Sequence, residues 1–185
     1  MTSGKQWLSY FFLPNFWGEE MILRKLMYNR LKKYVMKSDI DSEVKTKIVE
    51  ILDYINKIYE LLGFGEDIHS KNYLKILLDL DSVPKAIVLL GSHHFRNCGY
   101  IRCEYCPLRY VENNDIYCIP NMVSEYLYDI LLSESEKKIA DSYSCDIFIA
   151  PRFRKPFRYK ESYTVDDINH ILKTLEERYA ELIMS

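Results

Sequence analysis

The chain has 185 residues, enough for one domain with a hydrophobic core of its own. Its hydrophobic share of 48% and charged share of 28% are typical of folded proteins and argue against general disorder. The formal net charge of −2 excludes a protein that is basic over its whole surface. Any contact with nucleic acid must therefore come from a local basic patch.

Two residue types are used unusually: the chain has 16 tyrosines and only 6 glycines. Tyrosine combines a large apolar ring with a polar tip and is enriched at interfaces. The same bias is also typical of coding in an AT-rich genome. Composition thus hints at a virus, a mobile element or an AT-rich microbe.

Neither a membrane span nor a secretion signal is indicated. No run approaches the roughly 18 apolar residues that would cross a bilayer. The N-terminal residues lack a charged region followed by a small-residue cleavage site. We therefore expect a cytoplasmic, intracellular protein that does not contact a membrane, with its cysteines present as thiols or thiolates.

The chain begins with a dense aromatic segment, Trp7–Trp17, which holds six aromatic side chains. Such a segment either packs into the core or contacts a protein partner.

Two amphipathic helices are predicted next. Over residues 19–37 the apolar positions recur at helical spacing, and basic residues occupy the other positions. Asp39 and Asp41 are candidate caps for a second helix that ends near Leu62, before Gly63. Its isoleucines recur every three or four residues, so we expect the two helices to form an antiparallel pair.

Short apolar runs alternate with helices in the second half of the chain. We predict a helix over 70–80, a buried strand over 85–90, a helix from Pro120 to about residue 140, and a second strand over 145–150. The last helix begins at Thr164, where Asp167 completes a capping box. The predicted fold is α+β and predominantly helical, with about five helices and one or two short strands in a single domain, 1–185.

Within this domain, residues 91–120 are predicted to form an irregular cysteine-rich loop that binds a metal. Cys98, Cys103, Cys106 and Cys118 follow the spacing C-x4-C-x2-C-x11-C. Zinc prefers four such ligands in a tetrahedron, and a C-x2-C pair supplies two of them from one turn. We therefore predict a zinc site formed by these four cysteines.

Three other chemical states of the cysteines are compatible with the sequence. The C-x4-C-x2-C spacing resembles the plant-type ferredoxin pattern, although the fourth cysteine comes sooner here. A [4Fe–4S] cluster is a further alternative because the Cys106-Pro107 step is typical of cluster ligation. Disulfides are the third possibility.

His93 and His94 are reserve ligands, since His94 lies four residues before Cys98. If all four cysteines bind the metal, no coordination position remains open for water. A closed site of this kind is structural, so the pattern favours a non-enzymatic protein.

A second candidate site is the basic aromatic stretch 151–160. Its cations can neutralise phosphates and its rings can stack on unpaired bases of DNA or RNA. Arg96, Arg102 and Arg109 extend this surface if the two segments lie together. The residues of the stretch are Arg152, Phe153, Arg154, Lys155, Phe157, Arg158, Tyr159 and Lys160.

Three functions follow from these patterns. The leading hypothesis is a zinc-stabilised binding protein that contacts nucleic acid or a nucleoprotein through the cysteine loop and residues 151–160. The alternative is a protein–protein adaptor or assembly subunit that uses Trp7–Trp17. A metal-dependent nuclease with carboxylates at Asp79, Asp81 and Asp146, or an iron–sulfur protein, is the further alternative.

Overall fold

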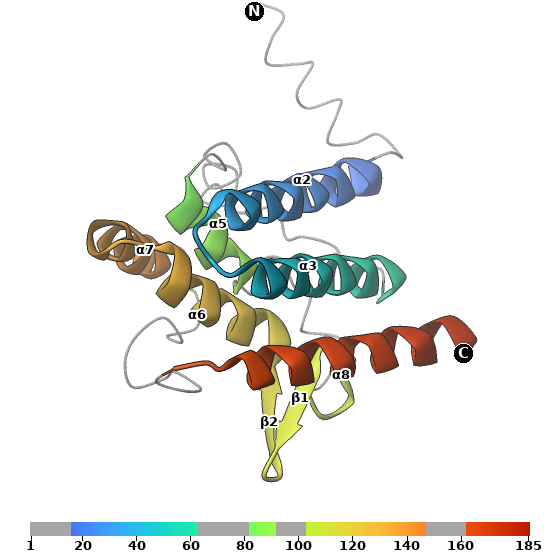
Figure 1. Cartoon of the computed structure of the whole chain (residues 1–185). Helices are drawn as coiled ribbons and strands as arrows, with labels where there is room; N and C mark the ends of the chain where they lie inside the picture. Colours follow the sequence, from blue (N-terminus) through green and yellow to red (C-terminus); the bar gives the residue numbers. More distant parts are fainter. Residues whose placement is uncertain (1–15, 63–81, 92–102, 147–161) are drawn as a thin grey trace, which may run out of the picture.

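The computed structural model describes residues 16–62, 82–91, 103–146 and 162–185, with the backbone alone for 16–24 and 144–146. These residues form six α-helices, a short 3₁₀ helix and a two-stranded sheet. The predicted predominantly helical α+β class is thereby confirmed. Figure 1 shows the helices α2, α3 and α8 side by side, with α5, α6 and α7 at one end of this group.

Helices α2 (Phe16–Lys37) and α3 (Ser42–Leu62) form the predicted antiparallel pair. A short link joins them, and the Asp41 carboxylate caps α3 by accepting from the backbone N–H groups of Glu43, at 3.0 Å, and Val44, at 3.4 Å. Lys32 and Asp53 form a salt bridge between the two helices. Gly63, which was expected to follow the end of α3, lies outside the described residues.

The buried strand predicted over 85–90 is wrong, because these residues belong to helix α5 (Val83–Leu90). Pro84 lies in the first turn, where its missing N–H costs no hydrogen bond. The helix packs against α2, α6 and α7, and the side chains from Ala86 to Leu90 are buried. A helix satisfies its own backbone in such apolar surroundings, whereas a strand would need neighbouring strands.

The long helix predicted from Pro120 to about residue 140 is two helices, α6 (Ile119–Leu131) and α7 (Glu134–Asp146). The break is at Leu132 and Ser133. The Ser133 backbone N–H donates to the Glu136 carboxylate at 3.1 Å, and the Glu136 N–H donates to the Ser133 hydroxyl at 3.3 Å. This reciprocal capping starts a new helix.

The second strand, predicted over 145–150, is wrong in its first two residues. Cys145 and Asp146 form the end of α7. Residues 147–150 lie outside the described part of the chain, as does the helix predicted over 70–80.

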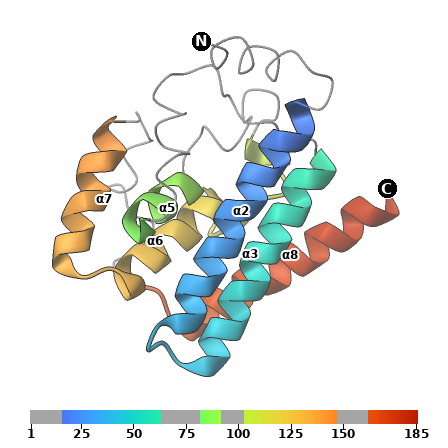
Figure 2. The ribbon, with the colours of Figure 1, turned by 90° about the horizontal axis from the view of Figure 1, so that it is seen from above.

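Helix α8 (Val165–Met184) begins with the predicted capping box, in which Thr164 and Asp167 each accept a hydrogen bond from the other's backbone N–H. The helix packs along α3. Between them the Lys57 ammonium lies 5.5 Å from the ring centre of Tyr54 and 5.6 Å from that of Tyr179. Figure 2 shows α2, α3 and α8 in succession from above.

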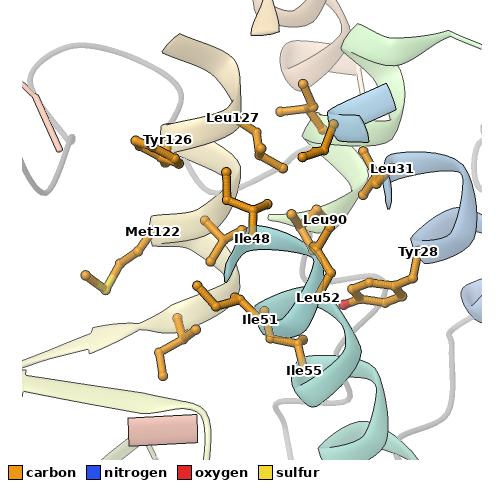
Figure 3. Close-up of a cluster of buried hydrophobic side chains, with 14 of the residues drawn as sticks. Tyr28, Leu31, Ile48, Ile51, Leu52, Ile55, Leu90, Met122, Tyr126 and Leu127 are labelled. Carbon is orange, nitrogen blue, oxygen red and sulfur yellow. The ribbon is translucent and has the colours of Figure 1, made fainter. Parts of the chain in front are cut away.

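The buried side chains of these helices form one continuous cluster. It includes Leu31 from α2, Leu52 from α3, Leu90 from α5 and Leu127 from α6 (Figure 3). None of the described helices is both long enough and apolar enough to cross a membrane.

Candidate functional site at the cysteine hairpin

The described part of the cysteine segment contains a β-hairpin that sequence reasoning did not predict. Strands β1 (Arg109–Glu112) and β2 (Asp115–Cys118) pair antiparallel, with Arg109 opposite Cys118 and Val111 opposite Ile116. Asn113 and Asn114 form the turn with φ values of 51° and 66°. Two left-handed residues are the requirement of the tightest hairpin turns, and asparagine tolerates this conformation well.

The Cys103–Cys106 pair forms a tight turn at the start of this hairpin. The 3₁₀ helix η3 (Cys103–Tyr105) contacts both strands. The Cys106 N–H donates to the Cys103 carbonyl at 3.3 Å. The predicted C-x2-C turn is therefore present.

Arg109 holds this turn through a single acceptor, the Cys106 carbonyl oxygen. The Arg109 backbone N–H donates to it at 3.1 Å and the guanidinium donates to it at 2.9 Å. Hydrogen bonds from a charged donor are stronger than neutral ones. Arg109 therefore contributes to the shape of the cysteine turn, in addition to any contact it makes with a ligand.

The hairpin brings Cys118 to the same end as the C-x2-C turn, because Cys118 is paired with Arg109. Cys103 is exposed, Cys106 and Cys118 are partly buried, and all three are thiols in the structure. Sulfur donors of this kind fit zinc or an iron–sulfur cluster. Within the described ranges, however, no three His, Cys, Asp or Glu side chains gather closely enough to hold a metal ion. Cys98, His93 and His94 lie outside those ranges.

The two faces of the hairpin differ in burial. Tyr110 is buried and Tyr117 packs against the core, so this face points inward. The cross-strand pair Val111 and Ile116 lies on the opposite face, because neighbouring residues in a strand point to opposite sides. Their side chains are 52% and 41% exposed.

The base of the hairpin is tied to the helical core. The Ile119 N–H donates to the Leu108 carbonyl at 2.9 Å, and both side chains are buried. Helix α6 begins directly after β2. The hairpin projects from this base beneath α8, as Figure 1 shows.

A buried carboxylate near the start of α8 was not anticipated from the sequence. Glu125 of α6 is 3% exposed and accepts a hydrogen bond from the Tyr163 hydroxyl at 2.8 Å. The Tyr163 ring meets that of Tyr126 edge-on at 5.7 Å, and burial raises the pKa of Tyr126. This contact joins α6 to the start of α8. Nothing in the sequence around Glu125 distinguishes this buried glutamate from the exposed glutamates of an amphipathic helix.

The structure describes only some of the remaining candidate residues. Asp146, expected in a strand as a nuclease carboxylate, belongs to helix α7, while Asp79 and Asp81 lie outside the described residues. The basic aromatic stretch 151–160 lies outside them too, as do Arg96 and Arg102. Of the aromatic segment Trp7–Trp17, only the backbone of the last two residues is described, in the first turn of α2.

Comparison of the chain with models of protein families, with curated proteins and with solved structures finds no match.

Proposed function

We propose that the chain is a non-enzymatic binding protein in which zinc, held by Cys98, Cys103, Cys106 and Cys118, fixes the loop 91–120. The observation that supports this most is the cysteine turn. Arg109 donates twice to the Cys106 carbonyl, and strand pairing brings Cys118 to the same end of the hairpin. A metal there would cross-link a short sheet that is marginal by itself.

The role of such a metal is structural. With four cysteine ligands no position remains for water or substrate, so the zinc would supply stability and shape and no catalysis. His93 and His94 are the replacements if one of the cysteines does not bind. An iron–sulfur cluster on the same ligands is the alternative that metal analysis would reveal.

Contact with nucleic acid is proposed for the basic stretch 151–160. Five cations among ten residues can neutralise phosphates, and three aromatic rings can stack on bases. Arg96 and Arg102 lie within the cysteine loop 91–120 and extend the same surface if the two segments meet. Arg109 can contribute only with donors not used in the Cys106 turn.

The first test is elemental analysis of the purified protein together with the substitution Cys106→Ser. We expect zinc in the parent protein, and loss of the metal with a lower melting temperature in the variant, because metal binding is coupled to folding. Cys145→Ser is the matched control, since Cys145 lies in α7, and it should keep its zinc. A parent protein without metal, or a Cys106→Ser variant of unchanged stability, would refute the zinc proposal.

The second test addresses nucleic acid. Charge reversal at Arg152, Arg154 and Arg158 should abolish binding of a single-stranded oligonucleotide and flatten its dependence on salt. Reversal of three exposed lysines on the helices, Lys25, Lys33 and Lys173, should change binding far less. Equal effects of the two triple variants would mean that net charge and not the stretch drives binding.

A protein–protein adaptor or assembly subunit is the second candidate function. The aromatic segment Trp7–Trp17 supports this function, and so does the exposed apolar face of the hairpin, with Val111 and Ile116. Binding through aromatic and aliphatic side chains hardly weakens with salt, which separates this function from phosphate binding.

A further inference from the structure

We propose that Cys103 and Cys106, called here the turn pair, form an oxidation site. Hydrogen peroxide converts the two thiols into a disulfide within the turn, and a thiol reductant restores them. Formation of the disulfide does not depend on a bound metal. Its effect on zinc, by contrast, rests on the proposed function.

The backbone brings the two cysteines of the turn pair close together. The 3₁₀ helix η3 begins at Cys103, and the Cys106 N–H donates to the Cys103 carbonyl at 3.3 Å. Residues three apart in such a turn lie one above the other, about 6 Å apart along the axis. A disulfide spans about 4.4–6.8 Å between Cα atoms. The bond can therefore form by side-chain rotation with little movement of the backbone.

Exposure distinguishes the two thiols. Cys103 is exposed, whereas Cys106 is partly buried and packs against the core. The Cys106 carbonyl also accepts two hydrogen bonds from Arg109, which hold this end of the turn. Oxidation is favoured at an accessible cysteine that has a second cysteine beside it. Cys103 is thus the residue that reacts with peroxide, and Cys106 is the residue that closes the disulfide.

The reaction has two steps and consumes one molecule of hydrogen peroxide. In the first, the Cys103 sulfur attacks a peroxide oxygen and the O–O bond breaks, which gives a sulfenic acid and water. In the second, the Cys106 sulfur attacks the Cys103 sulfur and displaces the hydroxyl group as a second water. Each sulfur loses one electron, the peroxide gains two, and both thiol protons end in water.

Cys118 is the third described cysteine of the segment, but it does not belong to the turn. It lies in β2, opposite Arg109. Within the described ranges it does not form with the turn pair a cluster close enough to hold a metal ion. We therefore expect the disulfide within the turn and not between the turn and β2.

Oxidation also changes the proposed zinc site. The thiolate is the form of cysteine that binds a metal, and a disulfide has none. The disulfide therefore removes two of the four proposed ligands, and the zinc leaves. The loop 91–120 then loses the cross-link that the metal supplies.

The test treats the full chain with hydrogen peroxide, alkylates the remaining thiols and analyses tryptic fragments by mass spectrometry. Cleavage after lysine and arginine leaves the turn pair together in fragment 103–109, while Cys98 and Cys118 fall in two other fragments. We expect fragment 103–109 to lose two hydrogens and to escape alkylation. Dithiothreitol should reverse both changes.

Two serine variants assign the disulfide to the turn pair. Cys106→Ser should abolish it and leave a sulfenic acid at Cys103, which dimedone traps. The matched control Cys118→Ser also removes a proposed zinc ligand but keeps the turn pair, so it should still form the disulfide. Loss of the disulfide in Cys118→Ser would contradict the assignment.

Zinc release, followed in the same samples with a chromogenic indicator, separates this proposal from the zinc proposal. Zinc that leaves in proportion to the disulfide supports both. A disulfide in a protein that contains no zinc supports the oxidation site and refutes the zinc proposal alone. Three results would overturn the oxidation site: retained zinc with reduced thiols, an irreversible sulfinic acid at Cys103, or a disulfide that joins Cys98 or Cys118.

Discussion

The guanidinium of Arg109 and its own backbone N–H donate to one oxygen atom, the Cys106 carbonyl. The sequence places Arg109 among the cations that can contact phosphate, because none of its neighbours in the sequence indicates a local acceptor. The spacing of three residues between Cys106 and Arg109 is what allows both bonds. One side chain thus links the cysteine turn to the first residue of β1.

Tyr126 supports a prediction on pH dependence. Burial raises the pKa of this phenol above its ordinary value of 10.0, so the folded protein binds the proton more tightly than the unfolded chain does. This difference in proton binding stabilises the folded protein fully below about pH 10, and the stabilisation is lost as the pH rises through the higher pKa of the folded state. In Tyr126→Phe the free energy of unfolding should therefore fall less steeply in this alkaline range.

Urea unfolding of both proteins at about pH 8 and about pH 11 measures this difference. Tyr105→Phe is the matched control, because its side chain is 70% exposed. If Tyr105→Phe and Tyr126→Phe change the alkaline slope equally, the effect does not arise from burial of Tyr126.

At the level of elements, the break between α6 and α7 depends on reciprocal capping by Ser133 and Glu136. Ser133→Ala should lower the free energy of unfolding by about 0.5–2 kcal/mol, because it removes the side-chain acceptor of the cap. Ser133→Asp should restore most of this loss, since aspartate is an equally good cap. Denaturant titration gives both values.

The exposed serine Ser142, in the middle part of α7, provides the control. Ser142→Ala should be close to neutral. A loss in Ser133→Ala no greater than in Ser142→Ala would contradict the capping role.

The sequence predicted those elements whose apolar residues repeat over several turns. Helices α3 and α8 are amphipathic over about 20 residues each, and Thr164 and Asp167 mark the start of α8. In α2 the buried residues Met27, Leu31 and Val35 recur at helical spacing. The strand prediction for residues 85–90 was wrong because a short apolar run has the same pattern in a buried helix and in a buried strand. The helical conformation of these residues is favoured by their burial against α2, α6 and α7, which is a tertiary contact that the local sequence does not encode.

The secondary structure of the cysteine segment was not predicted from the sequence, and its four cysteines as metal ligands stay a prediction. The alternation of Val111 and Ile116 with tyrosines around Asn113 and Asn114 is a hairpin signal in the sequence. The break at Ser133 was also visible as Ser-x-x-Glu. The contacts of Arg109 and Glu125, by contrast, depend on three-dimensional packing that no local pattern encodes.

For the molecule as a whole, α5 has the central position. Among the described helices it packs mainly against α2, α6 and α7, and Leu89 is fully buried. Leu89→Ala should lower the free energy of unfolding by about 2–5 kcal/mol, because the cavity cannot close fully among packed helices. Ile139→Ala, at a side chain that is 48% exposed, should cost much less.

Chemical denaturation at one temperature compares the two variants. If Leu89→Ala were no more costly than Ile139→Ala, α5 would not be the central packing element that its burial indicates.

The two-residue turn at Asn113 and Asn114 has a consequence for how this protein can change in evolution. Side chains alternate along a strand, so a slip by one residue would move Cys118 from the outward face to the face of Tyr110. Under the proposed zinc coordination, loss or gain of one residue in the turn would thus displace Cys118 without altering any cysteine. In homologues that keep the same chemistry, the length of this turn should be as invariant as the cysteines.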